Sequence, residues 1–180
     1  MARGQKLWED FGSCLLVWLR DMSPEQARAF FANPSDRTTG YCKDLLPRIG
    51  QLMNMGFVCE GAMRFDFQLR NESGLTEIFV ESENYINYIV AWNVHADTQE
   101  LEKLCYVRAP LKVIITSTEP YLGGRQRDRR ALIGDLKNRS VKRIAEFAKW
   151  LPESSEAVYG FAIGDSASVN LFPPATPPAA

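Results

Sequence analysis

Histidine is almost missing from this chain, and its few cysteines lie far apart. His95 is the single histidine, and no Cys-x-x-Cys pair occurs among the 180 residues. Structural zinc sites take their ligands from closely spaced cysteine and histidine residues, so this composition argues against a zinc site. Unpaired cysteines, in a chain that shows nothing resembling a secretory signal, favour reduced thiols and a cytoplasmic location. The four cysteines are Cys14, Cys42, Cys59 and Cys105.

Long apolar runs and a strong net charge are also missing. The apolar run at residues 14–19 is too short to span a bilayer, so we expect no membrane partner. The net charge of −1 is that of neither a histone-like nor a strongly acidic protein. We therefore expect a soluble protein in which local clusters of charge matter more than their sum.

The length and the apolar content of the chain predict one domain with a substantial core. Hydrophobic residues make up 46% of the 180 residues, which is enough for a single domain over residues 1–171. Residues 172–180 are rich in proline and alanine, a composition that predicts a disordered tail. Within the domain, we expect residues 1–40 to form a helical cover over a core at residues 41–164.

Apolar spacing and capping residues predict three helices in the first third of the chain. Apolar residues recur at intervals of three and four over residues 6–20. Ser23 followed by Pro24 is a favourable start for a second, short helix, and residues 35–40 are predicted to be a loop. The third helix is predicted at residues 41–55, with Gly56 as its C-terminal cap and an inner face of Leu45, Ile49, Leu52 and Met53.

Strand-like runs and helical patterns alternate along the rest of the chain. The near-continuous apolar run at residues 111–116 predicts a strand that is buried on both faces. A hairpin beside this strand, with helices between the later strands, predicts an α/β fold with a mixed β-sheet flanked by helices. The other predicted elements are strands at 57–69, 76–83 and 157–163 and helices at 97–107 and 125–151.

Acidic residues gather on the predicted hairpin that the strands at 57–69 and 76–83 form. Because alternate side chains of a strand share a face, Glu81 and Glu83 are expected to point the same way, and the turn can bring Asp66 across from them. Like charges held together repel each other unless a cation lies between them. Three carboxylates on one patch suit a hard cation such as Mg²⁺. The alternative is a solvated strand face.

In this arrangement the chain resembles the PD-(D/E)XK nuclease superfamily, whose core runs helix, strand, strand, strand, helix, strand. The resemblance rests on Asp66, on Glu81-Ser82-Glu83, on residues 104–114 leading into the third strand, and on the order of elements over residues 41–164. It implies a restriction-endonuclease-like core, here with extra N-terminal helices. It also implies a metal-dependent nuclease that uses Mg²⁺ or Mn²⁺.

The resemblance further assigns roles to individual residues. Asp66 matches the family's aspartate and Glu81 its second acid, and both would hold the metal ion. Glu83 stands where the family usually has lysine, so it would be a third metal ligand or the base that activates water. A lysine recruited from the long predicted helix is another option, and loss of the family chemistry is a third. The candidates for that lysine are Lys137 and Lys142, and those for the additional acid that the family often draws from its first core helix are Asp44 and Glu60.

Basic residues are concentrated in the predicted long helix, where they outnumber the acids. A basic face beside an acidic cluster is suited to binding the phosphate backbone of a nucleic acid. The alternative is an ordinary solvated helix face. The residues predicted to bind nucleic acid are Arg125, Arg127, Arg129, Arg130, Arg139 and Arg143.

Together these features predict a magnesium-dependent endonuclease that hydrolyses phosphodiester bonds in nucleic acid, with DNA as the first choice. Metal ions held by carboxylates would activate a water and neutralise the charged transition state. Because we expect no separate recognition domain, we expect the chain to act as a homodimer, or to recognise the structure of the nucleic acid and not a long sequence. The alternative is a catalytically inactive nuclease-like fold that serves as a nucleic-acid-binding or oligomeric interaction module. A third possibility is a homo-oligomeric structural protein whose interface uses aromatic residues of the first helices.

Overall fold

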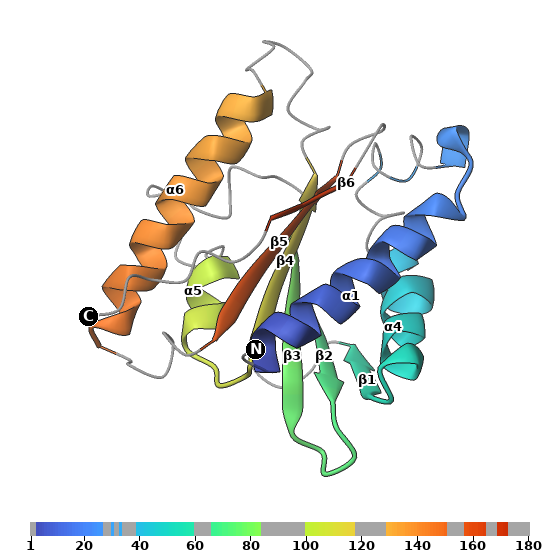
Figure 1. Cartoon of the computed structure of the whole chain (residues 1–180), viewed down its shortest axis with the longest axis horizontal. Coiled ribbons are helices and arrows are strands. Elements are labelled where there is room, and N and C mark those ends of the chain that lie inside the picture. Colours follow the sequence, from blue (N-terminus) through green and yellow to red (C-terminus); the bar gives the residue numbers. More distant parts are fainter. Residues whose placement is uncertain are drawn as a thin grey trace.

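In the part of the chain that the structure describes, six strands form one mixed β-sheet with helices packed on both of its faces (Figure 1). The computed structural model describes residues 3–26, 30, 33, 39–59, 66–83, 100–117, 129–150, 157–164 and 169–172. The predicted α/β class and the mixed sheet flanked by helices are therefore confirmed. The elements are α1 (Arg3–Arg20), η1 (Tyr41–Leu45), α4 (Leu46–Leu52), β1 (Gly56–Cys59), β2 (Phe67–Arg70), β3 (Thr76–Glu83), α5 (Glu100–Cys105), β4 (Leu111–Ser117), α6 (Arg129–Ala148), β5 (Val158–Gly164) and β6 (Val169–Phe172).

The strands lie in the sheet in the same order as in the chain. Strands β1, β2 and β3 form an antiparallel meander, β3, β4 and β5 run parallel, and β6 returns antiparallel to β5. Parallel neighbours need a crossover connection, and the segments that hold α5 and α6 provide the two crossovers. The carboxyl ends of β3, β4 and β5 therefore meet at one edge of the molecule.

The hairpin between β2 and β3 forms as predicted, but the strand predicted at residues 57–69 is wrong. This region contains two strands, because β1 and β2 pair with each other in antiparallel orientation, with Cys59 opposite Phe67. The rings of Phe57 and Phe67 stack on one another across this pair, with their centroids 6.1 Å apart. Two short strands that pair with each other satisfy the hydrogen bonds of their backbone N–H and C=O groups. In one long strand at the sheet edge, the groups on the outer side would have no strand partner.

The helix predicted at residues 41–55 begins with the π-helical turn η1 and ends earlier than expected, at Leu52. The predicted cap at Gly56 is wrong, because that residue already belongs to β1. Asn54 takes the left-handed conformation instead, with φ of 54°, and the backbone N–H of Met55 donates to the Gly50 carbonyl at 2.7 Å. This is a Schellman ending. The inner position predicted for Leu52 is also wrong, since the side chain is 72% exposed where the helix turns out of the core.

The aromatic residues of the first helix are part of the core. Trp8, Phe11 and Trp18 are buried between α1 and the sheet, and Trp18 meets Phe30 edge to face with ring centroids 5.2 Å apart. The possibility that these aromatic residues of α1 form an oligomer interface is therefore wrong. They lie in a core cluster that α1, η1 and α4 build on one face of the sheet (Figure 1).

Helices α5 and α6 cover the other face of the sheet (Figure 1). Leu104 of α5 and Ile144 of α6 are buried in a second core cluster, together with Ile114 of β4. Val113, the neighbour of Ile114, is buried in the first cluster, so β4 is buried on both faces as its apolar run predicted. The sheet therefore separates two cores, and alternate residues of each central strand belong to different ones.

Two predicted helices and one predicted strand are confirmed, the strand with bounds shifted by one residue, and one strand was not predicted. The helix predicted at 97–107 is α5, the helix predicted at 125–151 is α6, and the strand predicted at 157–163 is β5. Strand β6 pairs with β5 at the sheet edge and extends to the start of the predicted tail, of which residues 173–180 lie outside the described part of the chain. No helix among the described residues is both long enough and apolar enough to cross a membrane.

Candidate functional site

Asp66 and Glu81 come from neighbouring positions at one end of the β2–β3 hairpin. Phe67 pairs with Val80, so one further step along the two strands sets Asp66 opposite Glu81. The half-buried Asp66 carboxylate accepts a hydrogen bond from the backbone N–H of Ser82 at 2.8 Å. The side chain thereby continues the hydrogen bonding where the regular strand pairing ends. The two acids that the resemblance singles out thus lie close together, at the carboxyl end of β3.

Glu81 points toward the face of the sheet that α5 and α6 cover. It is two residues beyond Phe79, which belongs to the core cluster on that face, and it pairs in parallel with Ile114 of the same cluster. The side chain is 0% exposed. Burying an ionised carboxylate costs free energy unless an opposite charge or hydrogen bonds compensate it, so we expect compensating groups near Glu81.

Lys103 of α5 provides a positive charge beside Glu81. Its Nζ lies 4.0 Å from Oε2 of Glu81, and its side chain is 31% exposed. Leu101 and Leu104 hold the helix against the sheet and are buried, which brings the lysine to the rim of the same face. The site therefore combines two carboxylates from a hairpin with one ammonium group from the next helix.

Sequence reasoning looked for a lysine on the long helix and missed Lys103. Lys142 is exposed on α6, and the side chain of Lys137 lies outside the described residues. The signal that points to Lys103 is chain order: α5 is the next described element after β3, and a crossover helix packs on the sheet beside the strand that it leaves.

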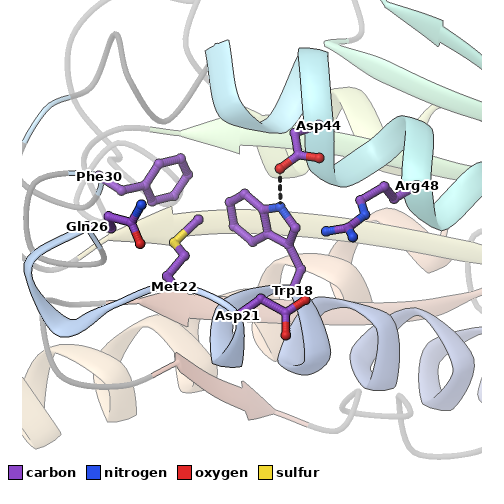
Figure 2. A pocket seen from close by; sticks show the side chains of 7 residues that line it. All are labelled: Trp18, Asp21, Met22, Gln26, Phe30, Asp44 and Arg48. Atoms are coloured by element: carbon purple, nitrogen blue, oxygen red, sulfur yellow. Dashed lines mark hydrogen bonds between the residues drawn. The ribbon is translucent and has the colours of Figure 1, made fainter.

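The remaining predicted acids are placed differently. Glu83 ends β3 and pairs with Thr116, but its side chain lies outside the described residues, as does all of Glu60. Asp44 lies in η1, where Oδ2 accepts a hydrogen bond from Nε1 of Trp18 at 2.6 Å (Figure 2). Because η1 packs on the α1 face, Asp44 belongs to the face of the sheet opposite to the one that Glu81 points toward.

A pocket of about 450 Å³ surrounds this Asp44–Trp18 hydrogen bond (Figure 2). Arg48 of α4 and Asp21, just beyond α1, add two further charged side chains to a pocket that is also lined by apolar residues. The hydrogen bond joins α1 to η1, so Asp44 has a structural role here. The lining residues are Trp18, Asp21, Met22, Gln26, Phe30, Asp44 and Arg48.

The basic residues of α6 differ in what they contact. Arg143 donates from Nε to Glu102 of α5 at 2.8 Å and from Nη1 to Glu146 at 3.0 Å, and its guanidinium lies over the ring of Phe147. The hydrogen bond to Glu102 raises the pKa of Arg143 above its usual value. Arg143 therefore ties α6 to α5, while Arg139 is exposed on the helix surface.

The other predicted phosphate contacts are not described at the level of side chains. Arg129 and Arg130 are the first residues of α6, and their side chains lie outside the described part of the chain. Arg125 and Arg127 lie wholly outside it. Their predicted role in binding nucleic acid stays a prediction.

The donor set of Asp66 and Glu81 fits a magnesium ion. Mg²⁺ is commonly held by one or two carboxylates, with water and substrate phosphate completing its coordination. Among the described side chains, which do not include Glu83, no group of three or more His, Cys, Asp or Glu residues is close enough to hold a metal. A site built from these two acids would therefore depend on substrate or water for its remaining ligands.

A second polar cluster lies deeper on the same face of the sheet. Lys112 of β4 is 1% exposed, and its Nζ donates to the hydroxyl of Tyr159 on β5 at 3.0 Å. That hydroxyl lies 3.7 Å from the sulfur of Cys105 on α5. Burial lowers the pKa of Lys112 to about 8 and raises the pKa of the Cys105 thiol.

Searches of protein families, curated proteins and solved structures found no match to this chain.

Proposed function

We propose that this protein is a metal-dependent nuclease with a restriction-endonuclease-like core, acting on phosphodiester bonds in nucleic acid and on DNA in the first instance. The observation that supports this most is the placement of Asp66 opposite Glu81 at the end of the β2–β3 hairpin, with Nζ of Lys103 4.0 Å from Oε2 of Glu81. Among the described elements, those from α4 to β4 follow one another as helix, strand, strand, strand, helix, strand, which is the order of the family core, with β3 and not the strand at 111–116 as its third strand. Ligands of α/β sheets bind at the carboxyl ends of the strands.

In this proposal, each group has one task. Asp66 and Glu81 hold Mg²⁺ or Mn²⁺, and the ion supplies charge neutralisation and an activated water when it is bound. Lys103 takes the place of the lysine that the family usually carries at the position of Glu83, and its ammonium orients the attacking water or stabilises charge on the phosphate.

Other residues extend this site toward the substrate. Glu83 is a further metal ligand or a base, and Lys137 and Lys142 are further candidates for the family lysine. The exposed face of α6, with Arg139, contacts backbone phosphates. Two copies of the chain act together as a homodimer, a state that sedimentation velocity measures directly.

The second candidate is a nuclease-like fold that has lost catalysis and binds nucleic acid or a partner protein. The complete burial of the Glu81 side chain next to Lys103 favours it, because a carboxylate engaged with a lysine is less available to a metal ion. The two candidates differ in what Glu81 does. A nuclease needs this carboxylate for metal binding and chemistry, whereas a binding module needs it for folding alone.

Plasmid cleavage tests the nuclease proposal. With supercoiled plasmid and Mg²⁺ or Mn²⁺, we expect the wild-type protein to produce nicked and linear DNA. Asp66→Asn, Glu81→Gln and Lys103→Met should each lower the rate by about 100-fold or more. The matched control is Glu9→Gln on the exposed surface of α1, which should cleave at the wild-type rate.

Calorimetry separates the two candidates. Binding of Mn²⁺ to the wild-type protein that is lost in Asp66→Asn supports the metal site. A wild-type protein that neither binds metal nor cuts DNA rules out the nuclease. Nucleic-acid binding that persists unchanged in Glu81→Gln, in a variant that is still folded by circular dichroism, supports the binding module.

A further inference from the structure

The thiols of Cys42 and Cys59 meet at the junction of η1 and β1. Their sulfur atoms are 2.7 Å apart, although the residues are 17 positions apart in the chain. Both side chains are half-buried against the core on the α1 face, and neither forms a disulfide bond. A disulfide bond is about 2.05 Å long, so a small rotation of either side chain brings the sulfurs to bonding distance.

The local fold explains why these two cysteines meet. Cys42 lies near the start of the helical segment, and Cys59 is the last residue of β1. The Schellman ending around Asn54 reverses the chain, so β1 runs back along α4. A helix rises about 1.5 Å per residue and a strand about 3.3 Å per residue, so the four residues of β1 run back along much of the length of the helix that precedes them.

We propose that Cys42 and Cys59 are a redox-active pair that forms an intrachain disulfide by exchange with a low-molecular-weight disulfide such as glutathione disulfide. One thiol loses its proton, and its thiolate attacks the small disulfide, forming a mixed disulfide and releasing one small thiolate. The second cysteine thiolate then attacks the mixed disulfide and releases the other. Two protein thiols are oxidised, one small disulfide is reduced to two thiols, and the two protons go to the released thiolates.

The bond would tie an edge of the sheet to the helices that cover it. In the described part of the chain, β1 lies at the edge of the sheet and pairs with β2. A disulfide between Cys59 and Cys42 would hold this edge strand against η1, which also carries the Asp44 that binds Trp18. Oxidation would therefore stabilise this corner of the fold, and reduction would release it.

The two other cysteines serve as internal controls. Cys105 is buried, Cys14 is half-buried on α1, and burial raises the pKa of both thiols. A raised pKa lowers the fraction of thiolate, the form that attacks a disulfide. We therefore expect Cys14 and Cys105 to stay reduced under conditions that oxidise Cys42 and Cys59.

The test is peptide mapping of the folded full-length protein after incubation with glutathione disulfide. The expected product is lighter than the reduced protein by two hydrogen atoms and yields one crosslinked tryptic species, residues 38–43 joined to residues 49–64. Dithiothreitol should reverse the change. The oxidised protein should unfold about 5 to 10 °C higher than the reduced protein, because the bond constrains the unfolded chain.

Single variants provide the matched comparison. Cys42→Ser and Cys59→Ser should each keep a glutathione adduct on the remaining cysteine, whereas Cys14→Ala should form the same crosslink as the wild-type protein. Three results in the wild-type protein would overturn the proposal: stable glutathione adducts without a crosslink, a crosslink that involves residues 7–20 or 104–108, or no oxidation of either thiol. Because mapping is done on the wild-type chain, the conclusion does not depend on the variants folding.

Discussion

Lys112 is a basic residue in the middle of an apolar strand. Its side chain is 1% exposed and donates a hydrogen bond to Tyr159. Burial lowers its pKa from 10.5 to about 8, because a buried ammonium group loses its hydration. The unfolded chain then binds the proton more tightly than the folded protein does. At neutral pH Lys112 is protonated in the folded protein, so its buried charge lowers the free energy of unfolding.

This cost predicts a stability that rises with pH. Between pH 8 and pH 10.5 the unfolded chain keeps the lysine proton while the folded protein has lost it, so the free energy of unfolding increases through this window. From about pH 7 to about pH 9 the gain should be about 1 kcal/mol, measured by urea denaturation. The raised pKa of Cys105 acts in the opposite direction above its usual value of 9.0, so the measurement should end there.

Two variants isolate the contribution of the lysine. Lys112→Met should remove the rise with pH and increase the free energy of unfolding at neutral pH. Tyr159→Phe keeps the lysine and should keep the rise. If Lys112→Met retains the wild-type pH dependence, the lysine is not its source.

At the scale of elements, α1 lies so close to the sheet that glycine is required on β5. A methyl group at Gly160 would overlap the indole ring of Trp8. Because the ring is buried in the core between helix and strand, it has little room to move. In α6, by contrast, a methyl group at Gly134 would meet nothing within 4 Å.

This contrast predicts opposite effects for the same substitution. Gly160→Ala should destabilise the protein by about 1 to 3 kcal/mol, because it forces α1 away from β5. Gly134→Ala should stabilise it by about 0.5 to 1 kcal/mol, since alanine favours a helix interior. Chemical denaturation of both variants at one pH measures the two effects. Equal effects of the two substitutions would show that α1 is not closely packed on the sheet in solution.

The elements also show what the residue pattern could predict. The helix at α1, the hairpin and β4 are recognisable because their apolar periodicity and turn residues are local signals. The division of residues 57–69 into β1 and β2 is not local, because it depends on which backbone groups pair across the sheet. Strand β6 was missed for the same reason, since its short run depends on the exposed edge of β5 for partners.

At the scale of the whole molecule, nucleic-acid binding would have to come from a local surface, because the net charge is only −1. Arg139 is exposed on α6, whereas Lys6 is exposed on α1 on the opposite face of the sheet (Figure 1). On the proposed function, α6 contacts backbone phosphates and α1 does not. The affinity should then fall as salt displaces the protein from the phosphates.

Fluorescence anisotropy with a labelled DNA duplex, over a series of salt concentrations, measures this dependence. Arg139→Gln should weaken binding and reduce the slope of log affinity against log salt by about 1. Lys6→Gln removes one positive charge as well and should change neither quantity. Equal losses in both variants would point to attraction by overall charge and would contradict a phosphate-binding surface on α6.

The candidate site was partly predictable from the sequence. The positions of Asp66 and Glu81 follow from a turn signal between two strand-like runs, which sets the register of a hairpin within a few residues. The sequence did not identify which lysine lies beside Glu81, because Lys103 reaches the strand through the packing of a crossover helix. The structural role of Arg143 also depends on packing, since Glu102 lies 41 positions away in the chain.

The α/β class, the alternation of the central strands and the acids on the hairpin follow from local patterns in the sequence, because periodicity and turn chemistry act over a few neighbouring residues. The lysine beside Glu81, the pairing of strands at the sheet edge and the contact between Cys42 and Cys59 depend on the folded chain. Those contacts join residues that are distant in the chain. These contacts form because two cores on opposite faces of one sheet bring helices and strands together. Local sequence patterns do not predict that packing.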